Sequence, residues 1–234
     1  MSNPLSVVII SKNEEKFIKD AILSSNFADE VLIVDSGSKD NTCSIASSLG
    51  AKVLTQDWLG FGAQKNKAIE LAKNDWVFVL DSDERITPEL QSEIHDILSN
   101  PIFDGYFVAR LNLFFGKFIK TCGLYPDYTI RLFNKKKGKF NDVAVHESVF
   151  VEGKTSKLSN HMLHLAYDNF DEFLIKQKKY AKLNNKKHNI YRALSSACWV
   201  FIKIFILKLG FIDGWRGFLI AKGYAQYNYW KYTC

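Results

Sequence analysis

The sequence predicts an α/β fold with a mainly parallel β-sheet and helices on both of its faces. Over the first hundred residues, short β-branched segments alternate with segments of helical spacing, an order typical of parallel strands joined by right-handed crossovers. Residues 76–80 are continuously apolar, as expected for a strand that is buried on both faces. Polar residues directly follow three of the predicted strands, where open α/β sheets bind their ligands.

Hydrophobic periodicity and capping residues define the elements of the first half. Strands are predicted at residues 5–10, 30–35, 51–56 and 75–81, and helices at residues 14–25, 38–50 and 62–74. Ile18 and Ile22 share one face of the first helix, and Gly50 stands where a left-handed residue ends the second. Thr87 and Pro88 predict that a further helix begins here, with Thr87 as its cap.

The pattern changes after about residue 102. Residues 104–119 and 139–153 have the character of strands with turns, and residues 168–189 predict a long amphipathic helix. We therefore expect one domain at residues 1–190, in two halves at 1–100 and 101–190. Residues 191–234 form a helical extension.

The extension is apolar and aromatic, but Lys203 and Lys208 interrupt it. A bilayer span needs roughly 20 apolar residues, and a lysine at the bilayer centre costs about 2.5 to 3.5 kcal/mol. The Lys, Arg, Trp and Tyr content of the extension suits a lipid headgroup boundary. We expect amphipathic helices that either contact a membrane surface or dock on the protein's own core.

Charge and cysteine content narrow the partners and the compartment. The net charge is +6 and the pI about 9.0, with basic runs at residues 134–139 and 176–188. Such runs favour a phosphate-bearing substrate, nucleic acid or an acidic membrane surface, and solvated helix faces are the alternative for each run. The four cysteines form no CxxC pair, which indicates neither a zinc site nor a disulfide framework. Because residues 1–10 lack the layout of a secretion signal, we predict a cytoplasmic location.

Three polar clusters at predicted strand ends should converge on one crevice: residues 11–15, 35–40 and 81–84. In the last cluster Asp81, Asp83 and Glu84 repel one another unless a positive charge lies among them. Their oxygens suit a hard divalent cation that also carries a phosphorylated ligand. The alternative is a solvated turn at a helix start. The buried strand that precedes these acids favours the metal site.

Several other activities lack their motifs in this sequence. A nucleotidyltransferase would place a glycine-rich loop after the first strand, where this chain has the acidic Ser-Lys-Asn-Glu-Glu. A haloacid-dehalogenase-type phosphatase also uses Asp-x-Asp, but after its first strand. Neither a GxGxxG nor a GxxxxGK motif is present. A non-enzymatic protein that binds membrane or nucleic acid through its basic aromatic second half is the alternative from another class.

The strand ends carry the motifs of a known family. "SVVIISKNEE", "VLIVDSGSKDNT", "GFGAQKNKAI" and "WVFVLDSDERI" occur in order, at the spacing of family-two glycosyltransferases. The chain resembles this family over residues 5–90. With "YPDYTIRLFNKKKGKF", "VHESV" and "HLAYDNFDEFLIKQKKYA" it looks most like the WaaE/KdtX-like branch, which adds glucose to the inner core of lipopolysaccharide. The resemblance implies the Rossmann-like GT-A fold, with residues 1–100 as its nucleotide-binding half and 101–190 as its acceptor-side half.

The resemblance also implies the residues that bind the nucleotide sugar. Asp35 matches the aspartate that hydrogen-bonds the base or ribose, and Ser11 and Glu14 match the nucleotide-side loop. Lys65 matches a basic residue that contacts the nucleotide or its phosphates. Arg131 is a candidate for the diphosphate. A helix cap remains the alternative for Asp35, and a plain helix surface the alternative for Lys65.

Asp81 and Asp83 match the DxD motif of the family and imply a divalent cofactor, Mn²⁺ or Mg²⁺. Asp83 is expected to bind the metal directly, and Asp81 to contact the ribose or a metal-bound water. His164 is a candidate further metal ligand with His161 as the spare, although a histidine next to apolar residues is more often structural. Glu84 is expected to be a helix-start charge.

The reaction implied by the resemblance is a single displacement that inverts the anomeric carbon of a nucleotide sugar. It needs a base beside the acceptor hydroxyl, and Glu147 stands at the family's catalytic position. His146 competes for this role, and Asp127 and Asp142 are weaker candidates. The expected partners are UDP-glucose, a lipid-linked saccharide acceptor and the cytoplasmic membrane surface, without nucleic acid. The enzyme would lie peripherally on the inner face of the bacterial inner membrane.

Overall fold

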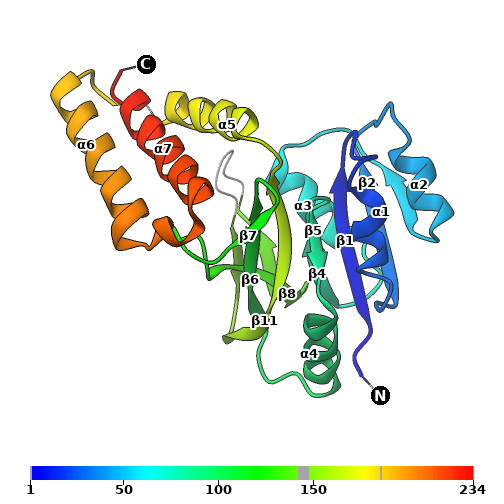
Figure 1. The fold of residues 1–234 in the computed structure, drawn as a ribbon. Helices are drawn as coiled ribbons and strands as arrows, with labels where there is room; N and C mark the ends of the chain where they lie inside the picture. The colour runs from blue at the N-terminus through cyan, green and yellow to red at the C-terminus, as the bar shows by residue number, and fades with distance from the viewer. Residues whose placement is uncertain (1, 142–147, 185, 234) are drawn as a thin grey trace. The chain divides into compact units, whose positions relative to one another are not determined.

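The computed structural model describes residues 2–141, 148–184 and 186–233 (Figure 1). The elements of the first hundred residues are β1 (Leu5–Ser11), α1 (Ile18–Leu23), β2 (Glu30–Asp35), α2 (Thr42–Ser48), β3 (Lys52–Thr55), α3 (Phe61–Leu71), β4 (Trp76–Leu80), β5 (Glu84–Ile86) and α4 (Pro88–Ser99). The predicted alternation of strands and helices is thereby confirmed. So is the start of α4, where Thr87 accepts a hydrogen bond from the backbone N–H of Leu90.

Parallel pairing joins the first four strands, in the order β3-β2-β1-β4. Alternate residues of these strands contribute to different cores, as the two-residue period of a strand requires. Val7 and Ile9 pack with α1, α2 and α4, whereas Val8 packs with α3 on the other face. The sheet therefore has helices on both faces, and the predicted fold class is confirmed.

The elements of the second half are β6 (Gly105–Phe114), β7 (Lys117–Ile119), β8 (Asp127–Asn134), β9 (Gly138–Phe140), β10 (Val149–Val151), β11 (Thr155–Tyr167), α5 (Phe170–Leu183), α6 (Ile190–Ile202), the π-helical turn η1 (Lys203–Leu207), the 3-10 turn η2 (Gly210–Asp213) and α7 (Trp215–Trp230). The sheet continues beyond β4 as β8-β6-β11-β5. Its antiparallel pairs include β4 with β8 and β5 with β11. β8 and β11 were not anticipated from the sequence.

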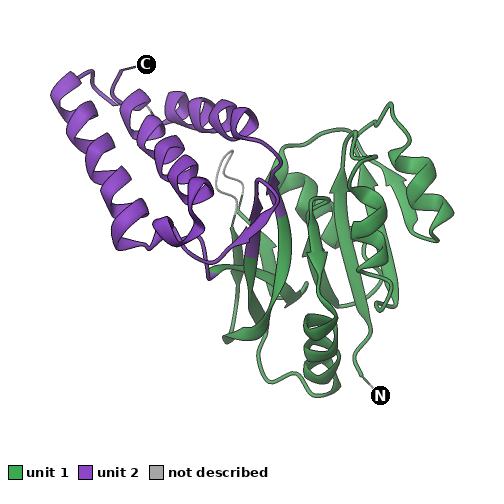
Figure 2. Cartoon of the chain, viewed as in Figure 1, with its two compact units in different colours: residues 1–110, 127–164 green, residues 111–126, 165–234 purple. Residues whose placement is uncertain are grey.

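The chain divides into two compact units (Figure 2). Unit 1 contains residues 1–110 and 127–164, and unit 2 contains residues 111–126 and 165–234. The division falls within β6 and β11 rather than at residue 190, and the domain boundary predicted there stays a prediction. All site residues discussed below belong to unit 1.

The helices α5, α6 and α7 belong to unit 2, beside its short β-segments. α7 packs between α5 and α6, and α6 continues through η1 and η2 into α7 as a helical hairpin (Figure 1). Among the described residues, one helical stretch, Ile190–Leu207, is long and apolar enough to cross a bilayer, with a mean hydropathy of 1.6. This stretch includes Lys203 and ends before Lys208, and 6% of it is buried.

Candidate active site

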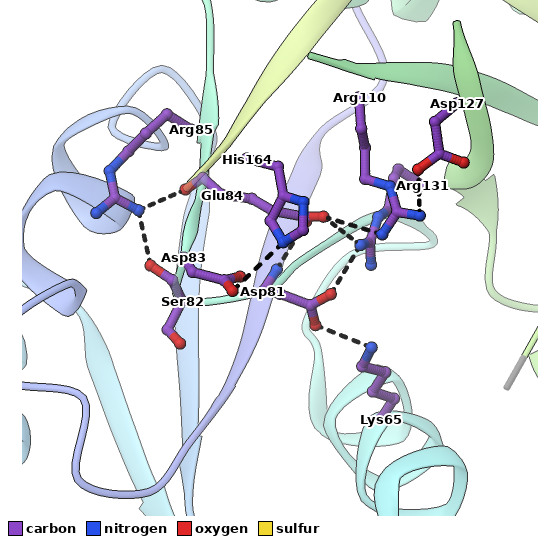
Figure 3. A network of polar contacts seen from close by, with 10 residues as sticks. All are labelled: Lys65, Asp81, Ser82, Asp83, Glu84, Arg85, Arg110, Asp127, Arg131 and His164. Atoms are coloured by element: carbon purple, nitrogen blue, oxygen red, sulfur yellow. Dashed lines mark hydrogen bonds and ion pairs between the residues drawn. The ribbon is translucent and has the colours of Figure 1, made fainter. Parts of the chain in front are cut away.

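The turn that follows β4 holds the acidic residues of the DxD motif (Figure 3). Every residue of β4 is buried, so the strand delivers Asp81 from a fixed position in the sheet. The backbone N–H of Glu84 donates to the carbonyl of Asp81 over 2.9 Å and closes the turn. Arg85 braces it from outside, because its guanidinium donates to the carbonyls of Ser82 and Phe17 over 2.7 and 2.8 Å.

Two cations of the protein hold the carboxylate of Asp81 (Figure 3). Lys65 Nζ lies 2.8 Å from Oδ1, and Arg131 Nη2 lies 2.7 Å from Oδ2. Burial alone would raise the pKa of Asp81, but the positive charges of Arg131 and Lys65 hold that pKa well below its ordinary range. Asp81 is therefore ionised, and each of its oxygens faces a cation of the protein.

Glu84 is fully buried and forms an ion pair, so its assignment as a helix-start charge is wrong. It begins β5, and its Oε1 accepts a hydrogen bond from Arg131 Nη2 over 2.5 Å. Its Oε2 accepts the backbone N–H of Asp81 over 3.1 Å. Burial raises the pKa of Glu84, the charge of Arg131 opposes this, and the charge of Asp81 acts with it. Glu84 thus fixes both Arg131 and the start of the turn.

A second ion pair, between Arg110 and Asp127, adjoins this network. Arg110 on β6 contacts Asp127 at the start of β8, with 2.6 Å between Nη2 and Oδ2. Its Nη1 is 3.9 Å from Oε1 of Glu84. Asp127, a weaker candidate for the base, is thus paired with Arg110. The register of β6 against β8 places Arg110 directly opposite Asp127, so the backbone sets this pair.

Asp83 lies apart from the two cations that hold Asp81 and faces His164 (Figure 3). The antiparallel register of β5 and β11 places His164 opposite Glu84, and its Nε2 is 3.4 Å from Oδ2 of Asp83. The side chain of Asp83 is 34% exposed and that of His164 is 17% exposed. A carboxylate and an imidazole that converge at a partly open position can supply two ligands to a hard divalent cation, and substrate oxygens can supply the others.

A site made wholly of protein ligands is absent from the described residues. No group of three or more His, Cys, Asp and Glu side chains there is arranged to hold a metal. The chemistry of the donor set agrees, because Asp81 is turned toward Lys65 and Arg131 rather than toward Asp83 and His164. The backbone carbonyl of His161, the spare candidate, accepts a hydrogen bond from the hydroxyl of Thr87.

The first two polar clusters are joined through Asp35. Its carboxylate is buried and accepts hydrogen bonds from the hydroxyls of Ser11 and Ser38 over 2.9 and 2.5 Å, and from two backbone N–H groups. Burial would raise the pKa of Asp35, but the hydrogen bonds from Ser38 and Ser11 lower it overall. Asp35 therefore organises the loop after β2 and joins it to the end of β1.

Glu14 brings the first cluster to the DxD turn. Its backbone N–H donates to the hydroxyl of Thr42, which fixes the loop after β1 against α2. Burial raises the pKa of Glu14, and the negative charges of Asp83 and Asp81 act in the same direction. The three strand-end clusters are thus within electrostatic reach of one another, as the sequence predicts. Ser11, Glu14, Asp35, Lys65, Asp81 and Arg131 remain predictions as nucleotide-sugar ligands.

Glu147 lies outside the described residues, together with His146 and Asp142. The residues that bound this segment are well fixed. Ser148 and Asn141 exchange hydrogen bonds through their backbones and side chains. Next to them, the side chain of Asn66 on α3 bonds both the N–H and the carbonyl of Phe140. Phe140 and Asn141 therefore lie beside α3, the helix that also carries Lys65.

The network that joins Glu84, Arg131 and Arg110 was not predicted from the sequence. One signal could have found it. Arg131 and Arg110 are each the single arginine among the apolar residues of their strands, and a buried arginine such as Arg131 requires a carboxylate partner. The identity of that partner depended on β8, a strand that the sequence analysis did not anticipate.

Comparison with known proteins places this geometry in a family. The model of glycosyl transferase family 2 matches residues 6–150. A glycosyltransferase of Rickettsia bellii of uncharacterised function is 33% identical over 96% of this chain and 83% of its own length. The lipopolysaccharide core biosynthesis glycosyltransferase LpsC of Rhizobium meliloti is 28% identical over 97% of this chain and 89% of its own.

A solved structure supports the fold. The complex of S. aureus TarS (residues 1–349) with UDP-GlcNAc superposes with a TM-score of 0.50, at 16% identity, over 96% of this chain and 81% of that one. This likeness concerns the fold, since the identity is low. The family model covers more than half of the chain, and it includes the strand-end clusters, Lys65 and the DxD turn. The chain belongs to glycosyl transferase family 2 and is a glycosyltransferase.

Proposed function

We propose that this glycosyltransferase moves a hexose from a nucleotide sugar to a lipid-linked saccharide, with inversion at the anomeric carbon. UDP-glucose is the expected donor and a lipopolysaccharide-core saccharide the expected acceptor, at the cytoplasmic face of a bacterial inner membrane. The name of LpsC supports the acceptor class, and the UDP-GlcNAc complex of TarS supports a uridine nucleotide. Because the chain is a glycosyltransferase, the non-enzymatic alternative is set aside.

One observation carries this proposal: the two carboxylates of the DxD motif have different partners. Asp81 is neutralised by Lys65 and Arg131, whereas Asp83 faces His164 at a partly exposed position. Asp83 and His164 would hold the divalent cation, Mn²⁺ or Mg²⁺, together with the donor diphosphate. When bound, that cation neutralises the charge that develops on the leaving nucleoside diphosphate.

The remaining roles fall to side chains of unit 1. The loop organised by Asp35, with Ser11 and Glu14, would receive the base and ribose. Lys65 and Arg131 would act on the donor through Asp81, whose carboxylate they hold in place. Glu147 would accept the proton of the acceptor hydroxyl while the new bond to the anomeric carbon forms and the bond to the diphosphate breaks.

Release of UDP from UDP-glucose and other UDP-sugars, with Mn²⁺ or Mg²⁺, tests the donor and metal claims. Asp83→Asn should abolish turnover, and Asp96→Asn, which changes an acid that is 80% exposed on α4, should leave it unchanged. EDTA should remove the activity, and re-added metal should restore it. Full turnover by EDTA-treated enzyme would contradict the metal claim, and no UDP from any donor would contradict the donor class.

Glu147→Gln tests the base. We expect it to spare donor binding, measured by calorimetry with UDP, and to remove transfer to the acceptor, because glutamine cannot take the proton. Glu152→Gln, a change of an exposed acid close in sequence, is the control. Normal transfer by Glu147→Gln would show that another residue, with His146 first, is the base.

A further inference from the structure

Unit 2 exposes an apolar stripe along α6. Leu194, Trp199 and Ile202 of α6 and Ile206 of η1, which continues α6, are between 43% and 57% exposed, and successive members are three to five residues apart. Among the described residues of α6, Ala193 is the one that is buried. α6 therefore has an outer face that α7 does not cover, and water is a poor solvent for it.

The stripe continues into the tip of the hairpin, where Leu209, Phe211, Ile212 and Trp215 are about half exposed. We call these residues and the α6 stripe the apolar face. The tip is held firmly, because Asp213 is buried and contacts Lys117 Nζ over 2.7 Å and the Thr121 hydroxyl over 2.5 Å. Its apolar side chains are exposed on a fixed support rather than on a frayed end.

Charge identifies the partner that this face fits. The sequence of unit 2 contains fourteen Lys and Arg against four Asp and Glu, a net charge of +10, whereas unit 1 carries −4. The basic run of unit 1 is paired within that unit, with Lys136 on Asp75 and Lys137 on Asp104. Two copies of unit 2 would repel each other. An apolar face on a strongly basic unit is complementary to an anionic bilayer.

We propose that the apolar face of unit 2 binds the surface of an anionic phospholipid bilayer and lies in its interface. The tip argues against a span by Ile190–Leu207. Through Asp213 the tip is bonded to Lys117 and Thr121, at and next to β7, and β7 pairs with β6. A helix that crossed the bilayer would have to carry these strands with it. Lys203, exposed beside the stripe, can reach lipid phosphates from an interfacial position.

This inference names the surface that would bring the proposed enzyme to its acceptor, but it stands on unit 2 alone. Vesicle binding without UDP release would support the membrane proposal and contradict the proposed reaction. UDP release without vesicle binding would support the proposed reaction and contradict the membrane proposal.

Cosedimentation of the full chain with vesicles tests the proposal. We expect binding to vesicles of equal parts phosphatidylcholine and phosphatidylglycerol, at least about tenfold tighter than to phosphatidylcholine alone, because several basic residues meet the anionic surface. Added salt should weaken binding. The variants Trp199→Ser/Ile202→Ser and Phe211→Ser/Ile212→Ser should each weaken it about tenfold or more.

Leu23→Ser/Ile102→Ser is the matched control, because it removes two exposed apolar side chains from unit 1, and it should bind as the wild type does. Circular dichroism and UDP release check that each variant is folded. Equal binding to neutral and anionic vesicles, or unchanged binding by both face variants, would overturn the proposal. So would resistance to alkaline carbonate extraction, which indicates a span, or a wild-type dimer that both face variants convert to a monomer while vesicle binding persists.

Discussion

Arg131→Met is the substitution whose effect follows most directly from the structure. The guanidinium of Arg131 donates through Nη2 to Asp81 over 2.7 Å and to Glu84 over 2.5 Å. Methionine keeps much of the volume but removes both bonds and the charge. Asp81 retains Lys65, whereas the nearest remaining cation of Glu84 that the structure describes is Arg110, at 3.9 Å. Glu84 is then a buried carboxylate without adequate compensation.

Removing one partner of a buried ion pair costs about 3 to 5 kcal/mol. For a chain of this size each kcal/mol shifts the melting temperature by about 2 to 4 °C, so we expect a fall of roughly 6 to 20 °C. Glu84→Gln leaves Arg131 on Asp81 and should cost less, about 1 to 3 kcal/mol. The double variant Arg131→Met/Glu84→Gln should be more stable than the sum of the two single losses predicts, by about 0.5 to 3 kcal/mol.

Urea unfolding followed by tryptophan fluorescence measures these effects, and Trp76 is a buried probe at the start of β4, the strand that ends at the DxD turn. The pH dependence provides a second test. Glu84 already has a raised pKa in the folded protein, and loss of Arg131 raises it further. When an acid has a raised pKa in the folded protein, the free energy of unfolding falls as pH rises through that pKa. The stability that Arg131→Met loses relative to wild type should therefore become smaller as pH is lowered from about 8 to about 5. A deficit below about 1 kcal/mol, or strict additivity with Glu84→Gln, would refute the buried-pair reasoning.

Three further predictions follow from other contacts. Lys65→Met removes one of the two cations on Asp81 and should lower both stability, by about 1 to 3 kcal/mol, and UDP release; Lys67→Met, whose lysine pairs with an exposed acid on the same helix, should change neither. Asp35 has a lowered pKa, so its stabilising effect is present above about pH 4 and is lost as pH falls; Asp35→Asn should therefore flatten the acid limb of the stability–pH curve, and an unchanged limb would contradict this. Gly62→Ala would place a methyl group against the backbone oxygen of Asn141, closer than van der Waals contact allows, and should lower the free energy of unfolding in urea by about 1 to 3 kcal/mol; an unchanged free energy would mean that the backbone at Asn141 shifts to make room.

The first half of the fold could be predicted from the sequence because its signals are local. β2 occupies Glu30–Asp35, as its β-branched run predicts, and the Thr87-Pro88 pair fixes the start of α4. These features depend on residues within a few positions of one another. The gathering of the strand-end clusters was also predictable, because parallel strands bring their carboxyl ends to the same edge.

The second half depends on long-range antiparallel pairing, which no local period reveals. β8 contains Asp127, Thr129 and Arg131 among apolar residues, so its pattern is neither alternating nor continuously apolar. β11 is thirteen residues long with much of its length partly exposed, so it lacks a clear two-residue period. Glu84 was misassigned for the same reason, since it is buried only because β8 and β11 lie beside the turn.

The crowding of acids after β4 has two separate physical causes, and they assign different roles to the two aspartates. The repulsion between Asp81 and Glu84 is relieved within the protein, by Arg131 between them and by Lys65 on the far side of Asp81. This compensation comes from the protein's own side chains, so it holds the turn in shape. Among the residues that the structure describes, no lysine or arginine forms an ion pair with Asp83, which faces His164 instead. In the proposed reaction, a cation that arrives with a diphosphate would therefore meet the carboxylate of Asp83 beside His164, on a turn that the neighbouring ion pairs hold in place.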